Sequence, residues 1–404
     1  MKWEKVKLGD ICKYVTSGGT PKSSIKEYYE PKQIPWLKTK EVNYCRIYET
    51  ESYISKDGLD NSSAKMIPQN SVIVAMYGQG DTAGRVAINK IPLTTNQACC
   101  NLIIDETKAY YEFVYYQLVT LYEKMVSLKN GGAQPNLNAA IIKSIEIKLP
   151  PLKTQRYIAD ILSSYDNLIE NNQKQIKLLE EAAQRLYKEW FVDLRFPGHE
   201  NTKIVDGVPE GWRVASIADI CDTVGGGTPS TKIQSYYEKG DILWVTPTDI
   251  TRNFSLALLD TEKKITPEGL KNSSAKMLPA ETILMTSRAS VGFFGMCKYE
   301  VCTNQGFISC IPKRENLQMY LLFNLKSRVE EIRQKAGGST YLEISKTVFR
   351  ELKIILPKDE VLAEYQKNVH DIFDEIYCRT EMIKSLVDMR NRLLPKLMSG
   401  EVEV

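Results

Sequence analysis

The side chains best suited to chemistry in this sequence lie in a glycine-rich segment, residues 77–85 (YGQGDTAGR). The segment follows a run that predicts a strand, so we expect a loop or hairpin that can approach another molecule closely. Gln79 can pair bidentately with adenine and Arg85 with guanine, while Thr82 suits a phosphate or methyl contact. These residue types predict the reading of DNA base edges.

A second segment at the corresponding place, residues 286–292, offers Arg288 and two hydroxyl groups. A third pair of polar segments follows Gly-Gly pairs in each half. One reading is that all of these are merely polar loops. They occupy matching positions but differ in sequence, which favours one scaffold that reads two different DNA half-sequences. The predicted DNA-binding residues are Lys38, Thr39, Tyr77, Gln79, Thr82, Arg85, Gln134, Asn136, Thr246, Thr248, Ser287, Arg288, Thr340 and Tyr341.

No catalytic motif accompanies these loops. The sequence lacks a G-x4-G-K-[ST] phosphate loop, a G-x-S-x-G nucleophile elbow, the tetrad of an adenine methyltransferase and a convincing D…E-x-K nuclease pattern. Its two histidines, His199 and His370, are expected to be solvated or capping. The nine cysteines lack zinc-site spacing and predict reduced thiols in a cytoplasm. We therefore expect no catalytic residue, metal ligand or cofactor on this chain.

Composition agrees with a globular protein. The 404 residues are 43% hydrophobic and 25% charged, which suggests two or three domains. No apolar run is long enough for a transmembrane helix, and the N-terminal residues do not resemble a signal peptide, so we expect no membrane association. The net charge of +3 alone argues neither for nor against nucleic-acid binding.

The chain is a tandem duplication of about 200 residues. Blocks of sequence return in the same order with an offset of 206 to 211 positions, and the six-residue block NSSAKM returns letter for letter. The paired blocks include 3–12 and 212–221, 18–21 and 226–229, 61–66 and 272–277, and 95–97 and 303–305. Agreement of so many blocks in one order excludes chance.

Each half divides into a mixed region and a long helix, so the predicted fold class is α+β. The mixed regions contain short β-rich runs and helical stretches separated by Gly, Pro and Asn, whereas the helical regions show a sustained heptad pattern. The predicted boundaries are 1–149 and 212–356 for the two mixed α/β domains, 150–196 for a central helix, 197–211 for a linker and 357–404 for a C-terminal helix.

Neither helix can bury its apolar stripe alone. The helices could pack on separate globular cores, but two equal heptads in duplicated positions favour packing on each other. Polar residues within the stripes, Asn172 and Gln175 in one helix and Arg379 and Arg390 in the other, would set register. Duplication favours pseudo-twofold symmetry, hence antiparallel helices forming a rod with one mixed domain at each end. The predicted seam residues are Ile158, Ile161, Tyr165, Leu168, Asn172, Leu179, Leu186, Val369, Ile372, Ile376, Ile383, Leu386 and Leu393.

These features together resemble the specificity subunit of a type I restriction-modification system, and the resemblance covers essentially the whole chain. It is carried by the Trp-x6-Asp-Ile starts of the mixed domains, the Gly-Gly-Thr-Pro loops, the central helix ending at 184–193 (QRLYKEWFVD) and the tail at 392–401 (RLLPKLMSGE). In this sequence the loop 77–85 is longer than its partner, so contacts cannot be transferred between the halves.

The resemblance implies a subunit without catalysis of its own. Two target recognition domains would each bind one half of a bipartite site in double-stranded DNA, with the helices setting the spacer. Two methyltransferase subunits carrying S-adenosylmethionine would dock on the helices and neighbouring surfaces and methylate one adenine per half-site. Motor-nuclease restriction subunits would join for cleavage.

Two other classes of function stay open on the residues alone. A mixed domain could itself be a methyltransferase, which methyl transfer by the isolated chain would reveal. The chain could instead be an architectural coiled-coil adaptor without a nucleic-acid role, which the absence of salt-dependent binding to duplex DNA would reveal.

Overall fold

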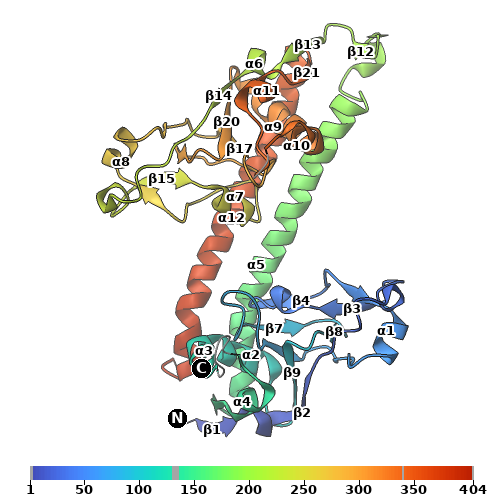
Figure 1. Cartoon of the computed structure of the whole chain (residues 1–404), viewed down its shortest axis with the longest axis vertical. Coiled ribbons are helices and arrows are strands. Elements are labelled where there is room, and N and C mark those ends of the chain that lie inside the picture. Colours follow the sequence, from blue (N-terminus) through green and yellow to red (C-terminus); the bar gives the residue numbers. More distant parts are fainter. Residues whose placement is uncertain (1–2, 130–135, 339–340, 403–404) are drawn as a thin grey trace. The chain divides into compact units, whose positions relative to one another are not determined.

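The computed structural model describes residues 3–129, 136–338 and 341–402, which form two compact units. Unit 1 contains the chain up to Asn167 together with the chain from Leu386 onward, and unit 2 contains Leu168–Ser385. Each unit therefore holds one mixed region and a length of both long helices, α5 (Leu152–Tyr187) and α12 (Asp359–Ser399) (Figure 1). The duplication is thus visible as two units of similar construction.

Unit 1 is built on a five-stranded sheet with the order β2-β9-β6-β7-β4, antiparallel except for the pair β4-β7. A three-stranded sheet, β5-β3-β8, and the antiparallel pair β1-β10 complete it. The elements before α5 are β1 (Glu4–Lys7), η1 (Leu8–Ile11), β2 (Cys12–Ser17), η2 (Lys26–Tyr28), β3 (Ile34–Leu37), η3 (Thr39–Glu41), β4 (Cys45–Ile47), β5 (Tyr53–Ile54), α1 (Lys56–Asp60), β6 (Val72–Ala75), β7 (Val86–Asn89), β8 (Thr94–Thr95), β9 (Cys99–Ile104), α2 (Tyr111–Thr120), α3 (Tyr122–Ser127), α4 (Ala139–Ser144) and β10 (Glu146–Leu149).

Unit 2 repeats this arrangement with one strand fewer in its main sheet. Its four-stranded sheet has the order β14-β20-β17-β18, its three-stranded sheet the order β16-β15-β19, and β13 pairs with β21. The elements between the long helices are η4 (Lys188–Val192), η5 (His199–Asn201), β11 (Ile204–Val205), β12 (Val208–Pro209), β13 (Arg213–Ser216), α6 (Ile217–Ile220), β14 (Cys221–Val224), η6 (Gln234–Tyr236), β15 (Ile242–Val245), α7 (Pro247–Thr251), β16 (Lys264–Ile265), α8 (Pro267–Lys271), β17 (Ile283–Thr286), β18 (Phe294–Gly295), β19 (Cys302–Thr303), β20 (Phe307–Pro312), η7 (Glu315–Leu317), α9 (Gln318–Ser327), α10 (Val329–Lys335), α11 (Lys346–Arg350) and β21 (Lys353–Leu356).

The core of unit 1 joins sheet, α2 and both long helices. Val74 of β6 and Phe113 of α2 share one buried cluster with Ile158 and Leu162 of α5 and with Leu397 of α12. Alternating strand residues supply one face of this core, and the helices supply their apolar stripes. The long helices therefore pack on the mixed region as well as on each other.

In unit 2, an aromatic cluster joins the long helices to the mixed region. Tyr187 is the last residue of α5 and Phe191 lies in η4, directly after it. The ring of Phe191 lies 4.7 Å from that of Tyr320 on α9 and 4.8 Å from that of Tyr365 on α12. The Tyr187 hydroxyl accepts a hydrogen bond of 2.7 Å from Asn324. The sequence 184–193, which marks the family resemblance, thus anchors both long helices to the mixed region.

Within each unit, α5 and α12 run antiparallel, as the heptads predict. In unit 2, Arg379 donates to Asn172 over 3.0 Å, and farther along, Tyr365 donates to the carbonyl of Ala183 over 3.4 Å. Higher numbers on one helix therefore meet lower numbers on the other. The prediction that Asn172 and Arg379 lie in the seam is confirmed.

The buried row of the first helix differs in part from the predicted seam. Leu162, Ile169, Ile176 and Ala183, one heptad apart, are all buried. Leu168 is 49% exposed, so its assignment to the seam is wrong. The heptad identifies the stripe, but a flanking row cannot be distinguished from the contact row by spacing alone.

No helix among the described residues is both long enough and apolar enough to cross a membrane.

Candidate nucleic-acid interface

The glycine-rich segment of unit 1 connects the antiparallel strands β6 and β7, which confirms the prediction of a hairpin loop. Gly80 and Gly84 adopt φ angles of +61° and +95°, which residues with a Cβ rarely tolerate. A Cβ atom on Gly78 would lie 2.8 Å from the side chain of Thr82. The glycines therefore allow the loop to fold tightly at the end of the sheet.

Two of the three side chains of this loop that are predicted to contact DNA stabilise the loop internally. The guanidinium of Arg85 lies 2.5 Å from a carboxylate oxygen of Asp81 and donates to Asn43 over 2.9 Å. Because of that guanidinium, the pKa of Asp81 lies below its usual value. The hydroxyl of Thr82 donates to the carbonyl of Gln79 over 2.7 Å, whereas the side chain of Gln79 is exposed. Gln79 is thus the best placed of the three to contact DNA.

The segment after α3 returns to the same place. The backbone N–H of Leu137 donates to the carbonyl of Met76 over 3.0 Å, so the exposed Asn136 lies beside the start of the hairpin loop, next to the half-buried Tyr77. Gln134 lies outside the described residues. The structure thus brings together two of the predicted loops of unit 1.

The predicted pair Lys38 and Thr39 lies elsewhere in unit 1, where β3 passes into η3. The ammonium of Lys38 lies 5.0 Å from the centre of the Trp36 ring. The side chain of Thr39 is buried, at 9% exposure. Its low exposure disfavours a DNA contact through this side chain.

Unit 2 brings the corresponding loops together. The loop between β17 and β18 contacts the segment before α11, since Ala289 N–H donates to the carbonyl of Leu342 over 2.8 Å. The guanidinium of Arg288 lies 3.7 Å from the carboxylate of Glu343, with both side chains about half exposed. Tyr341 is 60% exposed, and Thr340 lies outside the described residues. Arg288 and Tyr341 therefore belong to one surface.

Other side chains of unit 2 that are predicted to bind DNA are buried or form local hydrogen bonds. Ser287 is only 3% exposed. Thr246 caps α7, where its hydroxyl donates to Asp249 over 2.6 Å, and Thr248 is partly exposed on that helix. Ser287 and Thr246 therefore serve the local structure, and Arg288 is the predicted side chain of unit 2 best placed for base contact.

Repeated segments of the two units also expose polar side chains that are absent from the predicted DNA-binding residues. In each unit, an exposed threonine of the Gly-Gly-Thr-Pro loop donates to an exposed glutamine 77 residues later in the chain. The pairs are Thr20 with Gln97 and Thr228 with Gln305. The exact repetition of these exposed residues in both halves of the sequence could have indicated a functional role.

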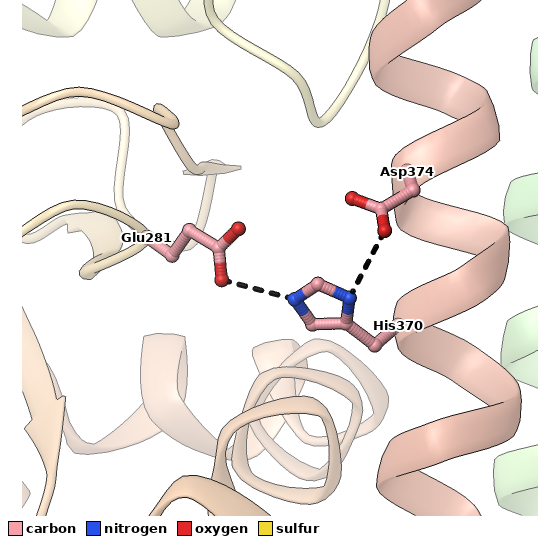
Figure 2. Close-up of side chains that lie close together, drawn as sticks. All are labelled: Glu281, His370 and Asp374. Atoms are coloured by element: carbon pink, nitrogen blue, oxygen red, sulfur yellow. Dashed lines mark hydrogen bonds and ion pairs between the residues drawn. The ribbon is translucent and has the colours of Figure 1, made fainter.

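One further polar cluster lies in unit 2, outside the loops. Nε2 of His370 lies 3.1 Å from Glu281, and Nδ1 lies 3.4 Å from Asp374 (Figure 2). The ammonium of Lys298 lies 2.5 Å from the other oxygen of Asp374. His370 therefore bridges two carboxylates and is not simply solvated. The cluster therefore connects α12 to the turn before β17 through the imidazole of His370, and to Lys298 through the ion pair with Asp374.

Comparisons with known proteins agree with the repeated architecture. A family profile described as "Type I restriction modification DNA specificity domain" matches residues 1–181 and 209–387. The MjaIX specificity subunit from Methanocaldococcus jannaschii is 30% identical, over 100% of this chain and 94% of that protein. The HindI specificity subunit from Haemophilus influenzae is 24% identical, over 99% of each. A type I S-subunit crystal structure from M. genitalium has the same fold, with a TM-score of 0.61 at 17% identity over 98% and 96% of the two chains.

Proposed function

The chain belongs to the family of type I restriction-modification DNA specificity subunits, and from this premise we propose that its two units each read one half of a bipartite site in double-stranded DNA. As a specificity subunit, it is the recognition component of its enzyme rather than the catalytic one. Methyl transfer to adenine and DNA cleavage then belong to partner subunits that this chain directs to their site.

The observation that carries the proposal is a shared scaffold with different loop residues. The hairpin loops β6-β7 and β17-β18 occupy the same place in two sheets whose first four strands follow the same order. The first loop presents Gln79 beside Asn136 of a neighbouring segment, and the second presents Arg288 beside the segment that contains Tyr341. Gln and Asn suit adenine and Arg suits guanine, so the two units would prefer different half-sequences.

Two methyltransferase subunits carrying S-adenosylmethionine are the partners that we propose, with restriction subunits joining them. Apolar side chains stay exposed on the long helices, although the seam is buried. They are Leu168 and Leu178 on α5 and Met382 and Met389 on α12. Exposed apolar groups on helices are suited to protein docking, and both long helices would contribute to it.

A loop exchange tests the proposal. Replacing residues 77–85 with the loop of another specificity subunit should change one half-site in the methylome of cells that carry the complex, and leave the other half-site unchanged. Replacing residues 287–292 should change only the other half. If both halves changed with either loop, the assignment of one half-site per unit would be wrong.

Assays of methyl transfer and of DNA binding distinguish the two other classes of function, a bifunctional methyltransferase and an architectural adaptor. A bifunctional methyltransferase would transfer methyl groups with the purified chain alone, whereas we expect transfer only after methyltransferase subunits are added. An architectural adaptor would support the complex without salt-dependent, sequence-selective DNA binding.

A further inference from the structure

Both units carry the same exposed polar surface, which we call the repeated surface. It is built from three segments that the duplication has kept nearly unchanged. The segments are 18–21, 61–66 and 95–97 in unit 1, and 226–229, 272–277 and 303–305 in unit 2. Their similarity contrasts with the loops proposed to read bases, which differ in both length and residues.

Packing explains why the glycines in this surface are repeated. A Cβ atom on Gly18 would lie 2.1 Å from the carbonyl oxygen of Thr95, and one on Gly19 would lie 2.3 Å from the backbone nitrogen of Ala64. The indole of Trp36 also donates to the carbonyl of Gly19 over 3.0 Å. Equivalent contacts occur at Gly226, Gly227 and Trp244. The glycines therefore bring the three segments together.

Packing does not explain the exposed side chains on the same segments. Thr20 donates its hydroxyl hydrogen to the amide oxygen of Gln97, and Thr228 does the same for Gln305 over 2.5 Å. All four residues are exposed. Since the threonine engages the amide oxygen, each glutamine keeps its NH2 group, with two donors, for an acceptor outside the chain.

A cation completes each copy of the surface. Lys65 and Lys276 stand at the fifth position of the identical NSSAKM segments, and both are exposed. Lys65 directly follows Ala64, which contacts the glycine pair. A nearby exposed lysine, Lys22, is not repeated, because Ser230 occupies its position. Lys65 donates to the hydroxyl of Thr16 over 3.2 Å, but Val224 stands at the corresponding position in unit 2, so this contact does not account for the repeated lysine.

We propose that the repeated surface binds the DNA phosphate backbone, once in each half-site and without regard to sequence. This inference rests on the proposed function. Two units that read different bases still meet one feature of DNA that does not depend on sequence, the phosphate backbone. Amide donors and a lysine cation are the groups that bind phosphate oxygens. The repeated surface fixes each unit on the duplex, and the variable loops select the sequence.

Two double variants test this surface in the complete complex with methyltransferase subunits. Lys65→Gln with Lys276→Gln removes both cations. Gln97→Glu with Gln305→Glu keeps the oxygen that accepts from threonine but replaces the donor group with a carboxylate. Binding is measured on a duplex containing the recognition site and on a random-sequence duplex, over a series of salt concentrations.

For the lysine variant we expect both duplexes to bind more weakly by the same factor, between about tenfold and a hundredfold at about 0.1 M salt. The slope of log K against log salt should fall by about 0.9 for each lost contact. The glutamate variant should weaken both duplexes as well. Lys13→Gln with Lys263→Gln is the matched control, since these exposed lysines are replaced by Asp222 and Ser52 in the other half. The control should leave the slope unchanged.

Three outcomes overturn the inference. One is an unchanged salt slope in the lysine variant when thermal unfolding shows it to be folded. Another is weaker binding of the recognition site alone, which would make the surface a base reader. The third is loss of methyltransferase subunits with unchanged DNA affinity, which would assign the surface, including the exposed Met66 and Met277, to a protein interface. If the unaltered complex did not distinguish the two duplexes, the proposed function itself would fail.

Discussion

Asp166 and Arg390, 224 residues apart in the sequence, form an ion pair of 2.5 Å between α5 and α12. The second oxygen of the carboxylate accepts a hydrogen bond of 2.5 Å from the hydroxyl of Tyr116 on α2. Burial and the nearby carboxylate raise the pKa of Tyr116. One buried carboxylate thus joins both long helices to the mixed region of unit 1.

Removing the cation from this group should strongly destabilise unit 1. The Arg390→Met variant leaves the carboxylate of Asp166 in a largely buried site, where its side chain is 11% exposed and accepts a hydrogen bond from the neutral hydroxyl of Tyr116. Loss of one partner of a buried ion pair costs about 3–5 kcal/mol. We expect the free energy of unfolding, measured by urea denaturation, to decrease by about 3 kcal/mol.

Arg392→Met is the control for this prediction, because Arg392 is an exposed arginine on the same helix. It should change the free energy of unfolding by less than about 0.5 kcal/mol. Adding Asp166→Leu to Arg390→Met should recover part of the loss, since no unpaired charge then remains buried. Equal effects of Arg390→Met and Arg392→Met would show that the ion pair does not stabilise the seam.

The close approach of the Gly-Gly-Thr-Pro loop predicts a second stability effect. In Gly226→Ala the new methyl group would lie 2.0 Å from the carbonyl oxygen of Thr303, so the backbone must shift. Overpacking of this kind costs about 1–3 kcal/mol or more. Gly337→Ala, in the same unit, meets nothing within 4 Å and should be nearly neutral. Thermal unfolding of the two variants compares them directly.

Burial predicts the reactivity of the cysteines. Desolvation raises the pKa of Cys12, Cys100 and Cys302 to about 12, so at pH 8 these thiols stay protonated and poorly nucleophilic. Cys378 is exposed on α12. Iodoacetamide at pH 8 should therefore modify Cys378 first, as followed by peptide mass spectrometry. Fast modification of Cys302 in the folded protein would contradict the packing of unit 2.

Much of this architecture could be predicted from local sequence patterns. Internal repeats predict two units of similar construction, and heptads predict two antiparallel helices, because repetition and periodicity are properties of the chain itself. The polar seam residues Asn172 and Arg379 were also predictable, since each interrupts an apolar stripe.

The roles of individual loop residues could not be predicted in this way. Arg85 is a suitable partner for guanine by residue type, yet Asp81 and Asn43 engage its guanidinium. Asn43 lies 42 positions earlier in the chain, and no local pattern signals such a contact. Ser287 is similar, since its burial depends on how the β17-β18 loop packs in three dimensions.

This difference between neighbouring side chains predicts distinct effects on DNA recognition. Gln79→Ala should relax selectivity at one position of one half-site by about 1–3 kcal/mol, without a change in thermal stability. Arg85→Ala should instead lower stability and weaken that half-site as a whole, because it removes the ion pair within the loop. Binding to a panel of single-base variants of the site tests both substitutions. A selective effect from Arg85 and none from Gln79 would reverse their roles.

The helices are predicted to set the spacer between the half-sites. The chain passes from one unit to the other between Asn167 and Leu168 in α5 and between Ser385 and Leu386 in α12. Inserting seven residues at both places keeps the heptad phase and leaves the pairing of Asn172 with Arg379 within unit 2. Each helix becomes about 10 Å longer, which corresponds to about three base pairs.

We therefore expect methylome sequencing of cells with this variant to show unchanged half-sites separated by a spacer about three base pairs longer. The same insertion in the linker 197–211 is the control, and it should leave the spacer unchanged because the linker lies outside both helices. Altering a half-site sequence is not expected, since neither insertion touches a recognition loop. An unchanged spacer in the helix variant would mean that contacts outside α5 and α12 determine the distance between the half-sites.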